Sequence, residues 1–281
     1  PVARKLSGYY PRVISLKSPD KPLTYKVPSS KPEILKRFNG PLVVSNMTSY
    51  PELNSVVYDN AGFKTDTITG EILKSDSSAD LIIVKNCPQI IPENVLLVLP
   101  YRIWSDKLEI YRTYPLFSPE TYQDSTHISG KLNLLLTGSN FNIEYLRNPV
   151  PETVLVMFTF NPEKEQYATD YFLNALEENN LSHNIVLNPV FMENNLEDLQ
   201  IKASSLLGRY ILDRRVTGIS ITNTGDIDLK DVTALAFSIL QCTETRITRT
   251  IYLSCPTCGR TKFNLQDSVK KVKEATGHLK G

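Results

Sequence analysis

Val154-Leu-Val-Met-Phe158 begins the stretch of sequence that decides the fold. Two further, nearly apolar runs follow it, Ile185-Val-Leu187 and Gly218-Ile-Ser-Ile221. Hydrophobicity that is continuous rather than alternating is typical of strands covered on both faces in a parallel sheet. We therefore expect three parallel strands between residues 154 and 221.

Apolar stripes with helical spacing lie between and after these runs, within residues 168–176, 199–211 and 229–240. Asn161 and Pro162 are expected to begin the first helix, as its cap and its first residue. Strand and helix thus alternate at roughly 30 residues per unit, the rhythm of a βαβ fold. We interpret all three stripes as core. The first consists of Ala168, Tyr171, Phe172, Ala175 and Leu176.

The first half of the chain is less regular. Residues 86–94 leave no room for a crossover helix, and residues 100–130 show no clean period. We expect a barrel-like, degenerate TIM-barrel-type α/β fold with a mainly parallel sheet over about residues 40–245. Four more apolar runs complete the seven expected strands: Pro41–Ser45, Leu81–Val84, Val95–Leu99 and Leu132–Leu136.

The sequence changes character after Thr245, which suggests a domain boundary. We expect a barrel-like domain over residues 1–247 and the beginning of a second domain over residues 248–281. Within the second part, Thr250–Leu253 is expected to form a short strand, followed by the cysteine pair and a basic helix. That helix, from Leu265 to Ala275, is expected to dock loosely because it lacks acidic neighbours.

The overall composition excludes several classes of protein. The 281 residues are 41% hydrophobic and 22% charged, and the net charge is +1, so the basic excess typical of nucleic-acid binding is absent. No apolar run approaches the length of about 20 residues that spans a bilayer. The sequence begins at Pro1 without a signal peptide, so we expect a cytoplasmic protein and an excised fragment.

Four cysteines are too few for a disulfide framework in a chain of this size. Cys87 and Cys242 are expected to lie alone in apolar surroundings. Cys255 and Cys258 are separated by two residues, a spacing that favours metal or redox chemistry in a reducing compartment.

Cys255-Pro-Thr-Cys258-Gly259 is the motif that carries chemistry. Thiolates are soft donors suited to iron–sulfur clusters and zinc, and a two-residue spacer on a tight turn directs both sulfurs toward one centre. Three alternatives remain open at this point: a thioredoxin-like redox pair, half of a structural zinc site, and two ordinary cysteines.

The residues around this motif resemble a known family. Ser254-Cys-Pro-Thr-Cys-Gly-Arg-Thr-Lys-Phe-Asn-Leu-Gln266 is similar to the start of the carboxy-terminal domain of 4-hydroxy-3-methylbut-2-enyl diphosphate (HMB-PP) synthase. Close similarity covers about the last 75 residues, whereas residues 1–200 match loosely and resemble the middle domain of the three-domain, plant-type enzyme. The other similar segments are Gly208–Asp213, Gly218–Asp226, Ser238–Cys242 and Ala275–Gly281.

The resemblance implies a fragment of an iron–sulfur oxidoreductase. This family converts 2-C-methyl-D-erythritol 2,4-cyclodiphosphate to HMB-PP in the methylerythritol phosphate route to isoprenoids, with electrons from flavodoxin or ferredoxin. Its [4Fe-4S] cluster is held by three cysteines and a glutamate, and the full-length enzyme is expected to be a homodimer. Cys255 and Cys258 correspond to the first two ligands. The other two would lie beyond Gly281, so the fragment alone is expected to be structural and inactive.

The rival interpretation is a self-contained α/β binding domain whose CxxC tail holds zinc or has no function. A basic cleft with convergent polar groups at the carboxyl ends of the strands would favour it, whereas a filled barrel end would favour the fragment. Several other polar residues are expected to be ordinary. His127 and His183 are interpreted as plain polar or partly buried residues, Arg260 as a surface residue, and Asp226, Asp228 and Asp231 as helix-capping or first-turn acids.

Overall fold

The seven apolar runs form strands of one parallel sheet, as their continuous hydrophobicity predicts. The computed structural model describes residues 25–28, 31–89, 91–106, 111–149, 152–251 and 264–276. The strands that arise from these runs are β1 (Leu42–Asn46), β4 (Leu81–Ile83), β5 (Leu97–Pro100), β7 (Asn133–Gly138), β8 (Val154–Phe160), β9 (Asn184–Phe191) and β10 (Gly218–Ile219).

An eighth strand, β6 (Thr113–Phe117), lies between β5 and β7 and was not expected from the sequence. Its sequence, Thr-Tyr-Pro-Leu-Phe, contains Pro115, which lacks the N–H that a strand normally donates. Here Pro115 is paired with Leu99 of β5 in the parallel ladder. Because Pro115 interrupts the apolar run, the hydrophobic pattern alone does not predict this strand.

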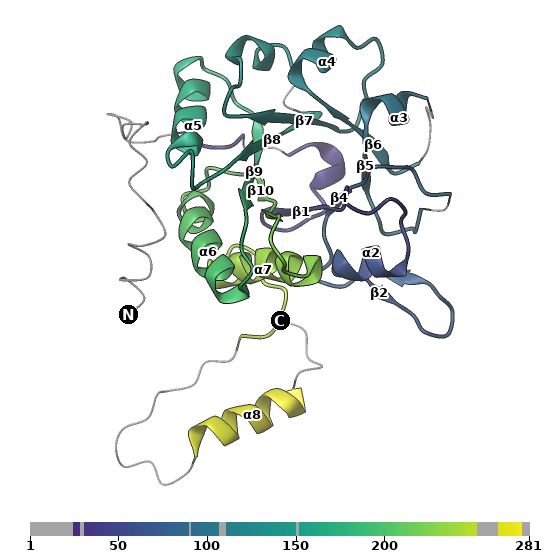
Figure 1. Cartoon of the computed structure of the whole chain (residues 1–281), viewed down its shortest axis with the longest axis vertical. Coiled ribbons are helices and arrows are strands. Elements are labelled where there is room, and N and C mark those ends of the chain that lie inside the picture. The colour runs from purple at the N-terminus through teal and green to yellow at the C-terminus, as the bar shows by residue number, and fades with distance from the viewer. Residues whose placement is uncertain are drawn as a thin grey trace.

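The sheet closes into a barrel because β10 pairs with both β1 and β9. The order β10-β1-β4-β5-β6-β7-β8-β9 contains only parallel pairs, so the expected barrel-like α/β fold is confirmed as a closed eight-stranded barrel (Figure 1). At the closure, a Cβ on Gly218 would lie 2.8 Å from both the Cβ and the carbonyl oxygen of Leu42. Glycine therefore lets the first and last strands approach each other.

Two short additions extend this barrel. β11 (Thr222–Asn223) continues from β10 and pairs with β9. An antiparallel pair, β2 (Lys64–Thr65) and β3 (Ile72–Leu73), is inserted between the helix at Ser55–Asn60 and β4.

Helices surround the barrel, and those of the second half are longer than those of the first (Figure 1). The described residues between β4 and β5 contain no helix, as expected from the short segment 86–94. The helical elements around the barrel are η1 (Glu33–Leu35), α2 (Ser55–Asn60), α3 (Tyr101–Ser105), α4 (Pro119–Asp124), η2 (Ile143–Leu146), α5 (Ala168–Glu178), α6 (Leu196–Leu212) and α7 (Leu229–Cys242).

The three expected stripes form α5, α6 and α7, with two corrections in α5. Its Tyr171 is 37% exposed and lies outside the core, contrary to our expectation. The helix begins at Ala168 and not at Pro162, because Asn161 is engaged in a turn. The Asn161 side chain accepts the N–H groups of Glu163 and Lys164 at 3.0 and 3.2 Å. Lys164, the last residue of this Asx turn, lies four residues before the first residue of the helix.

The barrel interior is packed with apolar side chains. Leu42, Leu81, Leu134, Leu155 and Val186 come from five different strands, are fully buried, and belong to one hydrophobic cluster. Leu35 and Phe38, which precede β1, join the same cluster from the amino ends of the strands. The interior is therefore a core and not a channel.

Candidate functional site

Cys255 and Cys258 lie outside the described residues, as does Arg260. Their assignment as ligands of an iron–sulfur cluster, and the boundary at residue 247, therefore stay predictions. The structure does describe both flanks of the motif, namely the chain up to Ile251 and a helix after it. Thr250 and Ile251 are not in a strand, contrary to expectation.

The chain that leads toward the cysteines is tied to the end of α7 by Gln241. The Gln241 side-chain oxygen accepts the N–H groups of Thr248 at 2.8 Å and Arg249 at 3.3 Å. Its amide nitrogen donates to the Arg249 carbonyl at 3.0 Å, and the Arg249 guanidinium donates to the Ser238 hydroxyl at 2.9 Å. Ser238 and Gln241 therefore fix the course of the chain seven residues before Cys255.

The helix after the motif, α8 (Leu265–Thr276), forms as predicted. The Asn264 side chain accepts the N–H groups of Gln266 and Asp267 at its start, as a capping residue does. None of the described residues of α8 is buried, and Val272 is 52% exposed.

No helix in the described part of the chain combines the length and hydrophobicity that crossing a membrane requires.

The other two cysteines have different environments. Cys87 is half-buried after β4, beside an apolar cluster, whereas Cys242 is exposed, so the expectation of apolar surroundings for Cys242 is wrong. Neither belongs to a group of three or more histidine, cysteine, aspartate or glutamate side chains within the described residues. The alternative of a structural zinc site rests on Cys255 and Cys258, which lie outside the described residues.

The two described histidines differ in burial. His127 is exposed, and its Nδ1 lies 2.9 Å from the Thr126 hydroxyl. His183 is buried, and its Nε2 lies 2.7 Å from the carbonyl oxygen of Leu146, while its Nδ1 has no hydrogen-bond partner. Burial lowers the pKa of His183. Both are structural or surface residues, as interpreted from the sequence.

The aspartates near α7 are exposed and act as expected only in part. Asp231 lies in the first turn of the helix, where a negative charge is favourable. Asp228 occupies the N-cap position, but its side chain makes no capping hydrogen bond. The Asp226 N–H donates to the side chain of Asn194.

The carboxyl ends of β8, β9 and β10 carry a neutral polar cluster. The Asn188 amide donates to the Thr159 hydroxyl at 3.1 Å, and the Thr222 hydroxyl donates to the Asn188 carbonyl oxygen at 3.0 Å. Ser220 is fully buried beside them, and its hydroxyl has no partner. Thr159, Asn188 and Thr222 are uncharged and hydrogen-bond to one another, so these three side chains offer no acid–base pair.

Three charged side chains just outside this cluster contact one another. Lys202 of α6 contacts Glu163, after β8, and Glu193, after β9, and its side chain is 8% exposed. Burial opposes the charge of Lys202, but hydrogen bonds and attraction from both glutamates outweigh burial and raise its pKa. This ion cluster fastens two loops to α6, and its one lysine is shared by two glutamates.

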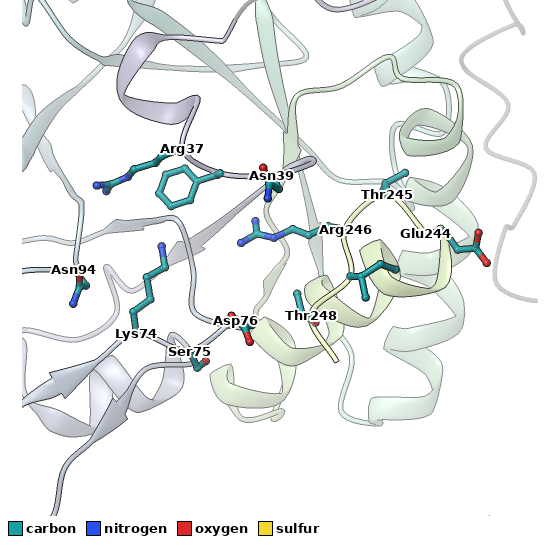
Figure 2. A pocket seen from close by; sticks show the side chains of 12 residues that line it. Arg37, Asn39, Lys74, Ser75, Asp76, Asn94, Glu244, Thr245, Arg246 and Thr248 are labelled. Carbon is teal, nitrogen blue, oxygen red and sulfur yellow. The ribbon is translucent and has the colours of Figure 1, made fainter. Parts of the chain in front are cut away.

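A second polar region lies at the opposite, amino ends of the strands. There Asp80, just before β4, is fully buried and is bound by Arg246, with Nη2 3.0 Å from Oδ1 and Nη1 close to Oδ2. The Val43 N–H also donates to Asp80 at 2.9 Å. A pocket of about 720 Å³ opens beside this pair, with Arg37 and Lys74 in its wall (Figure 2). Sequence reasoning missed it, because Asp80 and Arg246 are 166 residues apart.

The segments that carry the family resemblance have identifiable structural roles. The hydroxyl of Tyr210 donates to Asp170 of α5 at 2.8 Å, and Arg209 contacts the same carboxylate. These contacts join α5 to α6. In the other similar segments, Gly218 lets the barrel close and Gln241 holds the chain after α7.

Comparison with curated proteins gives a consistent result. A protein of Bacteroides fragilis named 4-hydroxy-3-methylbut-2-en-1-yl diphosphate synthase (flavodoxin) is 40% identical over 133 residues, which is 47% of this chain and 21% of that protein. Synthases of the same name from Phocaeicola vulgatus and Parabacteroides distasonis are 30% and 29% identical over 198 and 206 residues. The chain is a relative of these synthases.

The resemblance inferred from the motifs is thereby confirmed. The matches to the Phocaeicola and Parabacteroides synthases cover 69% and 72% of this chain, but 32% and 33% of those proteins. The chain thus spans about a third or less of the length of these synthases. No family model matches it.

Proposed function

We propose that the chain is part of an iron–sulfur reductive dehydratase, an HMB-PP synthase that acts on 2-C-methyl-D-erythritol 2,4-cyclodiphosphate in isoprenoid biosynthesis. The observation that carries this proposal is the 40% identity over 133 residues to a synthase of that name. The Cys255-Pro-Thr-Cys258 motif adds chemistry that suits such an enzyme, because its two thiolates are soft ligands for iron.

Cys255 and Cys258 would hold two irons of a [4Fe-4S] cluster. The cluster would supply single electrons and a binding site for the departing oxygen. Two thiolates fit this group as part of a ligand set, whereas a cubane requires about four ligands. We propose that a third cysteine and a glutamate complete the ligand set in the full-length enzyme.

The barrel is proposed to act as a scaffold that sets the position of the cluster domain. Its interior is filled by side chains such as Leu134 and Leu155, and the Thr159–Asn188–Thr222 cluster at the carboxyl ends is uncharged. A filled barrel end supports the scaffold over the rival binding domain, because TIM-barrel active sites are built from groups at these strand ends. Gln241 supports the same role, since it fixes the chain that runs toward Cys255.

The proposed partners follow from the same similarity. Flavodoxin, which stands in the names of the related synthases, is proposed as the electron donor, with ferredoxin as the alternative. We further propose a cytoplasmic homodimer for the full-length enzyme, with neither nucleic acid nor membrane as a partner.

Anaerobic reconstitution of residues 1–281 with iron and sulfide tests the incomplete ligand set. We expect no stoichiometric [4Fe-4S] cluster by visible absorption, and no conversion of the cyclodiphosphate with a reduced viologen. A stoichiometric cluster in the monomeric chain would show that all the ligands lie within it. One zinc ion per chain, bound through Cys255 and Cys258, would instead support the rival binding domain.

A further inference from the structure

The pocket at the amino ends of the barrel strands is the feature that the scaffold role leaves unexplained. It is formed by the segments that precede β1, β4 and β5, together with the chain after α7. Its volume of about 720 Å³ falls within the range of small-molecule sites. The pocket lies at the opposite end of the barrel from the Thr159–Asn188–Thr222 cluster.

Two cations beyond the one that Asp80 requires, Lys74 and Arg37, lie in the wall of this pocket, together with the exposed carboxylate of Asp76. Asp80 is fully buried, and a buried carboxylate needs one cationic partner, which Arg246 supplies with both of its terminal nitrogens. Arg246 is itself only 10% exposed and also donates to the Pro41 carbonyl at 3.2 Å. The buried pair is therefore neutral without any further cation.

Lys74 is the first surplus cation. Its Nζ lies 3.9 Å from Asp80 Oδ1, too far for a hydrogen bond, and 4.2 Å from the ring centroid of Phe38. Burial lowers the pKa of Lys74, attraction to Asp80 opposes this, and repulsion from Arg37 and Arg246 lowers it further. The Lys74 ammonium is thus partly desolvated and shares one carboxylate that another residue already occupies.

Arg37 is the second surplus cation. It is exposed, its guanidinium lies 4.9 Å from the Phe38 ring centroid, and it forms no ion pair within the described residues. Figure 2 shows Lys74 and Arg246 extending into the same space. Two acids, Asp76 and Glu244, also line the pocket, and the side chain of Glu244 points away from it. Asn39 and Asn94, also in the wall, supply neutral amide donors.

We propose that this pocket is a binding site for a phosphate-type oxyanion, held chiefly by Lys74 and Arg37. Such an anion would accept hydrogen bonds from an ammonium and a guanidinium that both lie beside the Phe38 ring. It would also relieve the repulsion among Lys74, Arg37 and Arg246. The ligand is either free phosphate or a small phosphate ester, since both present the same group.

The site makes the barrel a ligand-binding domain as well as a scaffold. Thr245, Arg246 and Thr248 line the pocket, and Thr248 is the residue that Gln241 holds on the path toward Cys255. An anion in the pocket would therefore contact the same segment that leads to the proposed cluster ligands. This inference does not depend on the cluster, so its test is separate from that of the proposed function.

Calorimetric titration of the whole chain with inorganic phosphate, and in parallel with glycerol 3-phosphate, tests the proposal at fixed ionic strength. We expect saturable binding of one anion per chain, weakened about tenfold or more by Lys74→Gln and by Arg37→Gln. Lys85→Gln is the matched control, because Lys85 is exposed after the carboxyl end of β4. Its affinity should equal that of the unchanged protein.

Arg37→Gln keeps the test decisive if Lys74→Gln fails to fold, because Arg37 is exposed and has no ion-pair partner within the described residues. Tighter binding of inorganic phosphate would identify the free ion as the ligand, and tighter binding of glycerol 3-phosphate would identify a phosphate ester. Absence of saturable binding of either anion, or an equal loss of affinity in Lys85→Gln, would overturn the proposal.

Discussion

The side-chain oxygen of Gln241 accepts the backbone N–H of Thr248 at 2.8 Å, and through this contact the last barrel helix directs the chain toward Cys255. Gln241 is 9% exposed, so its hydrogen bonds are shielded from water. This contact links the barrel, which we propose to act as a scaffold, to the segment that precedes the proposed cluster ligands Cys255 and Cys258.

Gln241→Ala should release the segment that contains Thr248 and Arg249. Thr248 is half-buried and Arg249 is exposed, and an ordinary hydrogen bond contributes about 0.5–1.5 kcal/mol, so we expect a decrease of this order in the free energy of unfolding. Hydrogen exchange should accelerate most at the amides of Thr248 and Arg249. Gln266→Ala, on the exposed face of α8, is the control and should change neither quantity. Equal exchange rates in both variants would show that Gln241 does not hold this segment.

The buried Asp80–Arg246 pair should be essential for folding. Arg246→Met leaves Asp80 buried without its main cationic partner, which we expect to cost about 3–5 kcal/mol in unfolding free energy. Denaturant unfolding measures the loss. The matched control is Lys230→Met, whose ion pair with Asp59 is exposed and should contribute little. A similarly small effect in both variants would argue against a structural role for Asp80.

Glycine at position 218 should be required at the barrel closure. An added Cβ meets Leu42 at 2.8 Å, so Gly218→Ala should overpack the contact between β10 and β1 and destabilise the fold by about 1–3 kcal/mol. Gly208→Ala, in the middle of α6, meets no atom within 4 Å and should instead stabilise by about 1 kcal/mol. Thermal unfolding of the two variants should therefore shift in opposite directions. A shift in the same direction would contradict the closure seen here.

Stability should fall as the pH decreases below about 6.5, the ordinary pKa of histidine. Burial lowers the pKa of His183, so the folded state resists the proton that the unfolded state accepts. The loss begins at the unfolded pKa and continues until the pH reaches the lowered folded pKa. His183→Gln should flatten this dependence, whereas His127→Gln, at an exposed site, should not. The measurement is the free energy of unfolding of each variant from pH 5 to pH 8. If His183→Gln keeps the same pH dependence as the unchanged protein, His183 plays no part in it.

The predictable part of the fold is the part with continuous hydrophobic runs. Strands such as Val154–Phe160 are covered on both faces, so almost every position is apolar and the sequence alone reveals them. β6 escaped detection because Pro115 and polar Thr113 interrupt the pattern. The start of α5 was misplaced because Asn161 caps a turn with the same hydrogen bonds that would cap a helix.

The two candidate sites also differ in whether neighbouring residues in the sequence specify them. A CxxC pair is local, so Cys255 and Cys258 could be identified by spacing. The pocket beside Asp80 depends on Arg246, which the barrel closure brings across the sheet from the other end of the chain. No local pattern specifies such a contact, and only the three-dimensional structure reveals it.

The iron content of the proposed full-length synthase, purified without oxygen, tests most directly whether Cys255 and Cys258 hold a cluster. Cys255→Ser and Cys258→Ser should each abolish the [4Fe-4S] absorption and the conversion of the cyclodiphosphate. Cys87→Ser removes a half-buried thiol outside the motif and should leave both largely intact. Equal iron content in all three variants would contradict the assignment of Cys255 and Cys258 as cluster ligands.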